Sequence, residues 1–293
     1  MNSDSKNLNP HKLVDDQCVH CFTRSYQRIF KKFNIKGDQQ TDFIGYFDEV
    51  MSQKDKLTSP EIQQLLKSKL CRLISIIDPY EEEKKHSNEL ALSLYPKWKA
   101  KVLESPEPFE MALRLSLAGN VMDYGAHESF DINKSITEVL SSPLAINDAA
   151  LLKERVSKAH KILYLGDNTG EIVFDKLFIE TMMHNNILFA VRGGVALNDA
   201  TMEDALAVGM DKVADVISNG FDAPSTVLHK SSDAFLDEYK SADLIISKGQ
   251  GNFEGLMNVK DHRIFFLLMA KCNVIANVLG VKKGSFVVYN QAQ

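Results

Sequence analysis

The sequence contains little that would place the protein in a membrane or outside the cell. Residues 1–16, MNSDSKNLNPHKLVDD, are polar and lack the apolar segment of a secretory signal peptide. No apolar run approaches the ~20 residues that a transmembrane helix needs. The nearest one, RIFFLLMAKCNVIANVLGV, is interrupted by Arg263, Lys271, Asn273 and Asn277. A cytoplasmic protein without a membrane partner is therefore expected.

Cysteine and paired histidine are also scarce. The four cysteines include one CxxC pair, Cys18 and Cys21, and none of the eight histidines forms an HxxxH or HxH pair. Cysteines three residues apart share one face of a helix, but a zinc site needs four ligands. In a reducing compartment a disulfide framework is not expected. A metal or redox role and buried structural thiols remain alternative interpretations of the CxxC pair.

Positive charge is not in excess. The formal net charge of the 293 residues is −5, with 44% hydrophobic and 25% charged residues. Such a balance is typical of a globular protein with a sizeable core. It gives no global signal for a nucleic-acid or anionic-membrane partner. The oligomeric state is not indicated by any pattern in the sequence.

The pattern of the chain changes near residue 145, so we predict a helical subdomain over 1–145 and an α/β domain over 146–293. The first part holds apolar residues at helical spacing, as in SPEIQQLLKSKLCRLISII, where Ser59 is a candidate N-cap and Pro60 fits the first helical position. The second part alternates short apolar strands with helical stretches: KILYLG, NILFAVRG, KVADVIS, ADLIISKG and SFVVY. IFFLLMA fits either a buried strand or a helix. This alternation predicts an α/β fold with a mostly parallel, doubly wound sheet.

Polar, glycine-rich segments follow four of the predicted strands. They are GDNTGE after the first, RGG with Asn198 and Asp199 after the second, SNG after the third, and SKGQGNFE after the fourth. Open parallel sheets bind ligands beyond the carboxyl ends of their strands. Each segment alone is more typical of a helix cap or a turn. Four of them in one predicted sheet favour a binding site.

The residue types in these segments indicate phosphoryl chemistry. Asp167, Asn168 and Asp199 offer hard oxygen ligands for Mg²⁺, Mn²⁺ or a similar divalent ion. Arg192 and Lys248 are typical phosphate partners, and neighbouring glycines allow backbone N–H groups to approach an anion. Helices that begin after these segments would favour negative charge at their N-termini.

These residues resemble a known family. LGDNTGE, RGGVALNDAT, SKGQGNFEG and AKCNVIA are similar to the metal-dependent damage-control phosphatases, formerly a family of unknown function. The resemblance extends to CVHCFTRSYQ, DPYEEEKKHSNELAL and LAGNVMDYGA, and it looks closest to the compact branch with an N-terminal CxxC pair. It implies a Rossmann-like three-layer core and hydrolysis of phosphate monoesters of small metabolites, such as sugar phosphates or damaged phosphometabolites.

The resemblance also implies roles for individual residues. Asp167, Asn168 and Asp199 would hold the divalent metal ion, which is Mn, Ni, Co or Mg, and Lys248 would lie near the substrate phosphate. Asn120 and Asp123 would line the substrate pocket, with a helix cap and turn as the alternative. From the residues themselves, Arg192 and the amides near Gly170 and Gly249 are candidates to neutralise the phosphoryl group, Asn252 is a further candidate for substrate binding, and Asp199 or Glu171 is the candidate for orienting the attacking water.

Two other functions compete with this hypothesis. A methyltransferase that uses S-adenosylmethionine could share the architecture, but the strand-end segments lack G-x-G-x-x-G. A non-catalytic protein that binds a metal or a phosphometabolite is the second alternative, and the complete set of hard ligands together with cations argues against it. A phospho-aspartyl intermediate is disfavoured, because the second residue after Asp167 is Thr169 rather than an aspartate.

Overall fold

The computed structural model describes residues 14–119 and 132–291. The chain forms two compact units, residues 1–77 and 78–293, and each is described by itself. The domain boundary that the sequence predicts near residue 145 stays a prediction. Within the described residues, no helix is both long and apolar enough to cross a membrane.

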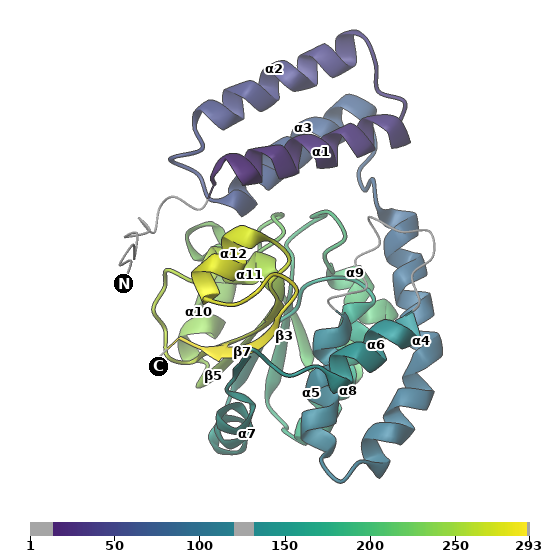
Figure 1. The fold of residues 1–293 in the computed structure, drawn as a ribbon, viewed down its shortest axis with the longest axis vertical. Helices are drawn as coiled ribbons and strands as arrows, with labels where there is room; N and C mark the ends of the chain where they lie inside the picture. The colour runs from purple at the N-terminus through teal and green to yellow at the C-terminus, as the bar shows by residue number, and fades with distance from the viewer. Residues whose placement is uncertain (1–13, 120–131, 292–293) are drawn as a thin grey trace. The chain divides into compact units, whose positions relative to one another are not determined.

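The first unit contains three helices, α1 (Asp16–Lys32), α2 (Asp38–Ser52) and α3 (Ser59–Ile74) (Figure 1). Phe43 of α2 is buried between two aromatic rings of α1, with centroids 4.7 Å from Tyr26 and 5.2 Å from Phe30. The N-cap of α3 is Thr58 rather than the predicted Ser59. The Thr58 side chain accepts from the Glu61 backbone N–H, while the Glu61 carboxylate accepts from the Thr58 N–H, which makes a capping box.

The second unit is built on a seven-stranded sheet in the order β1-β7-β6-β5-β2-β3-β4. Neighbouring strands are parallel, except for the antiparallel pair β6–β7. The strands are β1 (Ile146–Asn147), β2 (Ile162–Leu165), β3 (Ile187–Val191), β4 (Asp215–Ser218), β5 (Leu244–Lys248), β6 (Ile264–Met269) and β7 (Phe286–Asn290). The segment that fitted either a strand or a helix is thus strand β6.

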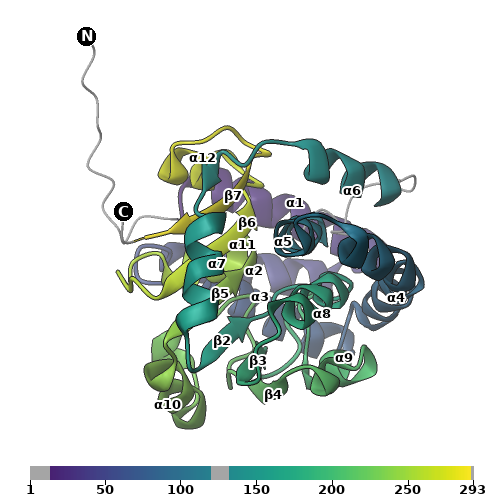
Figure 2. The ribbon, with the colours of Figure 1, turned by 90° about the horizontal axis from the view of Figure 1, so that it is seen from below.

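Helices cover both faces of this sheet (Figures 1 and 2). Ile162 and Tyr164 of β2 belong to the core shared with α4, α5 and α8, whereas Leu163 and Leu165 pack toward α10 and α11. The helices of this unit are α4 (Glu81–Glu104), α5 (Pro108–Gly119), α6 (Ile132–Ser141), α7 (Ala149–Lys158), α8 (Glu171–Met182), α9 (Met202–Ala207), α10 (Asp233–Ser241), α11 (Gly249–Leu256) and α12 (Asn273–Leu279), with short 3₁₀ turns η1 (Met210–Lys212) and η2 (Leu228–Lys230). The predicted α/β fold with a mostly parallel sheet in three layers is confirmed.

The central strand β2 lies between β3 and β5. From β2 the chain passes through α8 to β3 on one side, while β5 pairs with the other side. The direction of winding therefore changes between β2 and β5, which is where open α/β sheets form their ligand crevice. The segments that follow β2, β3 and β5 meet at this edge.

Candidate functional site

Backbone hydrogen bonds join the segments that follow β2 and β3. The Ala200 N–H donates to the Asp167 carbonyl at 2.8 Å, and Asn168 forms an isolated β-bridge with Asp199. Gly166 allows the first segment to pass close to β3, because a Cβ there would lie 2.6 Å from Cζ of Phe189. These contacts bring together the three predicted metal ligands, all of which are buried.

The guanidinium of Arg192 lies between the two aspartates. Its Nε is 2.6 Å from Oδ2 of Asp199, its Nη2 is 2.9 Å from Oδ1 of Asp167, and its Nη1 donates to Oδ1 of Asn252 at 2.8 Å. Arg192 therefore contacts one oxygen of each carboxylate and holds the orientation of both. Side chains that orient metal ligands in this way are a regular part of metal sites.

The surroundings of Asp167 disfavour the ionised form of its carboxyl. Burial raises the pKa of its carboxyl well above the ordinary value, the negative charges of Asp199 and Glu171 raise it further, and Arg192 opposes them. The backbone of Gly249 also lies close to this carboxylate, because a Cβ there would be 1.8 Å from Asp167 Oδ2. Gly249 also has a φ of +76°. Only glycine fits this position without moving the aspartate.

A second group of buried charged side chains is centred on Lys248. The ammonium of Lys248, at the end of β5, is 2.6 Å from both Glu171 Oε1 and Asp175 Oδ1, and it also donates to the Ser116 carbonyl at 2.9 Å. Tyr164 donates its hydroxyl to the same oxygen of Asp175 at 2.8 Å. Burial by itself would lower the pKa of Lys248, but Asp175 and Glu171 hold it above its ordinary value. We name Lys248, Glu171 and Asp175 the lysine cluster.

Taken together, the two groups carry more negative than positive charge. Asp167, Glu171, Asp175 and Asp199 are buried with only two buried cations, Arg192 and Lys248. With all four acids ionised, two formal negative charges would not be neutralised by these two cations, which fits the raised pKa values of Asp167 and Asp175. Buried charge without compensation is costly, so the arrangement is suited to a divalent cation.

The lysine cluster predicts a pH dependence of stability. Burial raises the pKa of Asp175 from 3.8 to about 7, with Lys248 lowering it and Glu171 raising it. Between these values the native state holds a proton that the unfolded chain has lost, so stability falls as the pH rises toward 7. Asp175→Asn removes this titration. We expect the free energy of unfolding of the variant, relative to that of the wild type, to increase by on the order of 1–3 kcal/mol between pH 5 and pH 8.

This difference can be measured by urea unfolding followed through the fluorescence of Trp98. It is the single tryptophan of the chain, and it is buried in α4 of the second unit. Exposed Asp211→Asn serves as a control that should track the wild type at both pH values. An equal stability difference between Asp175→Asn and the wild type at pH 5 and pH 8 would contradict the prediction.

Gly170 and Asn252, two further residues of the predicted site, form hydrogen bonds to neighbouring segments. Gly170, with a φ of +74°, donates its N–H to Oδ1 of Asn88 at 2.7 Å. Asn252 donates to the carbonyls of Gly166 at 3.0 Å and Lys248 at 2.8 Å, which ties the segments after β2 and β5. Their roles toward a substrate stay predictions, as do those of Glu171 and Lys248.

Sequence reasoning missed Asn88 and Asp175. Asn88 lies on α4, 82 residues before its partner Gly170, so no local pattern links the two. Asp175 stands among apolar residues of α8 and is fully buried; an isolated acid in an apolar helix was the available signal. The predicted substrate residues Asn120 and Asp123 lie outside the described residues.

Cysteines and carboxylates elsewhere give no sign of a metal cluster. Cys18 and Cys21 lie on α1, and no disulfide joins any of the four cysteines, all of which lie in the part of the chain that the structure describes. Within residues 14–119 and 132–291, no group of three or more His, Cys, Asp and Glu is placed to hold a metal ion. The candidate ligand set has two carboxylates and one amide, so water molecules would have to complete the coordination of a hard cation.

The chain matches a known protein family over most of its length. The damage-control phosphatase ARMT1-like domain matches residues 14–287. The chain belongs to this family. The match spans the segments after β2, β3 and β5 in this ARMT1-like protein. The finer assignment to a branch with an N-terminal CxxC pair stays a prediction.

Relatives of this ARMT1-like chain cover most of its length. Damage-control phosphatase PH1575 of Pyrococcus horikoshii is 34% identical over 280 residues, covering 94% of this chain and 96% of the relative. A damage-control phosphatase of Archaeoglobus fulgidus is 35% identical, covering 73% and 76% of the two chains. The crystal structure of the DUF89 family protein from Pyrococcus horikoshii has a TM-score of 0.87 with 32% identity and covers 95% and 99% of the two chains.

Proposed function

We propose that the protein is a metal-dependent phosphatase that hydrolyses phosphate monoesters of small metabolites, sugar phosphates or damaged phosphometabolites, in the cytoplasm. The family and the names of two relatives support a phosphatase. The observation that supports the metal dependence is the gathering of four buried acidic side chains with two buried cations, at the ends of β2, β3 and β5 and along α8. Its partner in this proposal is a small phosphorylated substrate, with no nucleic acid or membrane involved.

The residues present fit a hard divalent cation. Asp167, Asn168 and Asp199 would hold it, since carboxylate and amide oxygens suit Mn, Co, Ni or Mg. Arg192 contacts Oδ1 of Asp167 and Oδ2 of Asp199, and the Asn168 amide donates to Oδ2 of Asp167 at 3.2 Å, so the three proposed ligands lie within reach of one another. When bound, such an ion polarises a phosphoryl oxygen and stabilises the charge that develops there.

The remaining steps belong to side chains and amides of this chain. Arg192 and the backbone at Gly170 and Gly249 would neutralise the phosphoryl oxygens, helped by the N-termini of α8 and α11. The Gly170 N–H would have to exchange its bond to Asn88 for one to the phosphoryl group. Asp199 or Glu171 would orient the attacking water and take its proton. Lys248 would stabilise the charge of Glu171, which it contacts at 2.6 Å, and its proposed place near the phosphate would require the ammonium to leave this pair.

The proposal is tested by assaying the purified protein with p-nitrophenyl phosphate and a panel of sugar phosphates. Protein freed of metals on a chelating resin should be inactive, and addition of Mn²⁺, Co²⁺, Ni²⁺ or Mg²⁺ should restore turnover. A phosphodiester, bis(p-nitrophenyl) phosphate, serves as the control for monoester preference. Failure of every monoester with every metal, in protein that melts cooperatively, would favour the non-catalytic binding protein instead.

A further inference from the structure

A cationic face of α1 lies outside the proposed catalytic residues. Residues 17–37 contain five lysines and arginines and not one aspartate or glutamate, in a chain whose net charge is −5. Phe22, Tyr26 and Ile29 of α1 are apolar and buried, and the Tyr26 ring packs on Phe43 of α2 in the same unit. The charge is therefore concentrated locally, on a helix whose orientation is fixed by its core contacts.

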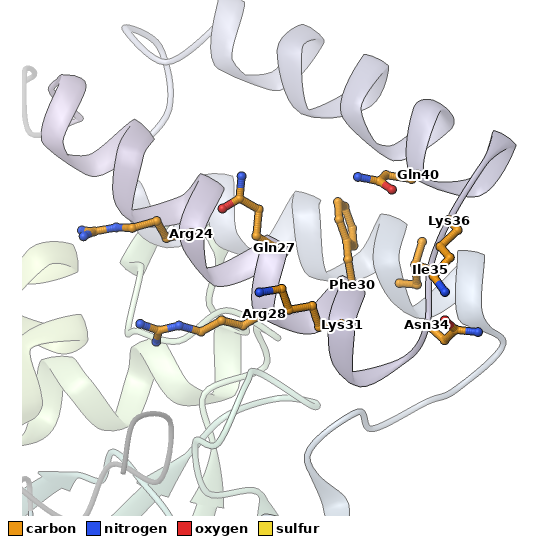
Figure 3. Close-up of a pocket in the computed structure, with 9 residues that line it drawn as sticks. All are labelled: Arg24, Gln27, Arg28, Phe30, Lys31, Asn34, Ile35, Lys36 and Gln40. Carbon is orange, nitrogen blue, oxygen red and sulfur yellow. The ribbon is translucent and has the colours of Figure 1, made fainter.

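This face borders a pocket within the first unit. Its volume is about 660 Å³, and its lining includes Arg24, Arg28, Lys31 and Lys36, together with the apolar side chains of Phe30 and Ile35. Figure 3 shows Arg24 and Arg28 extending from the same side of α1, one turn apart. The volume lies in the range of small-molecule sites, which is about 300–1,000 Å³.

The four cations of this pocket have no neutralising partner among the residues that the structure describes. Among the residues that the structure describes, Arg24, Arg28, Lys31 and Lys36 take part in no ion pair, whereas Lys54 pairs with Asp16 and Lys69 with Asp42 in the same unit. Like charges one helical turn apart destabilise a helix by a few tenths of a kcal/mol per pair. An anion bound among them would remove this repulsion.

We propose that this pocket binds a small organic ligand with two anionic groups, such as a bisphosphorylated metabolite or a phosphorylated carboxylic acid. Two arginine forks one turn apart suit a phosphate group, because guanidinium matches its oxygens bidentately. Lys31 and Lys36 provide point charges for the second group, and Phe30 and Ile35 face the carbon body. The negative charge of the whole chain favours a small ligand over a nucleic acid.

Binding is tested on the full-length protein in metal-free buffer by isothermal titration calorimetry. The probes are propane-1,3-diol bisphosphate and, for a single anionic group, propyl phosphate. Two charge-matched variants address the two ends of the pocket, Arg24→Gln with Arg28→Gln and Lys31→Gln with Lys36→Gln. The control is Lys153→Gln with Lys158→Gln, which removes the same charge from exposed positions of α7.

We expect the wild type to bind the bisphosphate at least tenfold more tightly than the monophosphate. Each pocket variant should weaken bisphosphate binding tenfold or more, and the control should change it less than twofold. Equal losses in control and pocket variants, no binding to the wild type at millimolar probe, or displacement of the probe by a lower concentration of single-stranded RNA would each overturn the proposal. Because the assay involves neither metal nor turnover, its outcome is independent of the proposed phosphatase activity.

Discussion

Replacing Asp167 by asparagine is expected to abolish most metal-dependent turnover, lowering kcat/KM by roughly 10³-fold, which is about 4 kcal/mol. The substitution removes one of the two carboxylates proposed to hold the cation, and with it the charge that a divalent ion needs. The side chain keeps its shape, so its Oδ1 still accepts from Arg192, which is 2.9 Å away. Folding should be nearly unchanged, because burial and neighbouring acids already raise the pKa of this carboxyl and disfavour its charge.

The measurement combines kinetics with direct titration of metal. Turnover of p-nitrophenyl phosphate is followed across Mn²⁺ concentrations, and Mn²⁺ binding is measured by calorimetry on the same preparations. Asp167→Asn should show weakened binding as well as lost turnover. Exposed Asp211→Asn, which carries the same change of charge away from the strand ends, should match the wild type in both. Wild-type Mn²⁺ affinity in Asp167→Asn would remove this residue from the ligand set.

Replacing Lys248 by methionine is expected to have the largest effect on stability. Its ammonium is fully buried between Glu171 and Asp175. Methionine has a similar length but no charge, so two carboxylates would stay buried without their cation. Loss of one partner from a buried ion pair costs about 3–5 kcal/mol. For a unit of this size, that loss lowers the melting temperature by about 10 °C.

A charge-balanced variant separates the loss of charge from the loss of packing. Lys248→Met combined with Glu171→Gln and Asp175→Asn removes the whole lysine cluster and should recover most of the stability lost in the single variant. Urea unfolding followed through Trp98 measures all three proteins. If the triple variant were as unstable as Lys248→Met, the shape of the lysine side chain rather than its charge would account for the effect.

The strands of the sheet were predictable because fully buried parallel strands leave continuous apolar runs in the sequence. Every residue of β2, β3 and β5 is buried. The segment of β6 stayed ambiguous, because its conformation is decided by pairing with β5 and β7, which are distant in the chain. At α3 the predicted cap Ser59 was wrong by one residue, because the reciprocal bond between Thr58 and Glu61 makes Thr58 the cap.

For the site, the sequence predicted which segments meet but not how their charges pair. Asp167, Asn168 and Asp199 follow neighbouring strands of one sheet, so their approach followed from topology. The contact of Lys248 with Asp175 did not, because it joins the end of β5 to the middle of α8 across 73 residues. Such contacts depend on side-chain packing in three dimensions and leave no spacing rule in the sequence.

The position of β7 in the sheet affects the order in which the sheet can form during synthesis. This last strand lies between β1 and β6, and within the described residues β1 pairs with β7 alone. During synthesis, at about 5–20 residues per second, β1 leaves the ribosome before β7 and stays without this partner until β7 has emerged. Completion of the sheet therefore waits for β7, and a chain cut before Phe286 would leave β1 and β6 without the strand that lies between them.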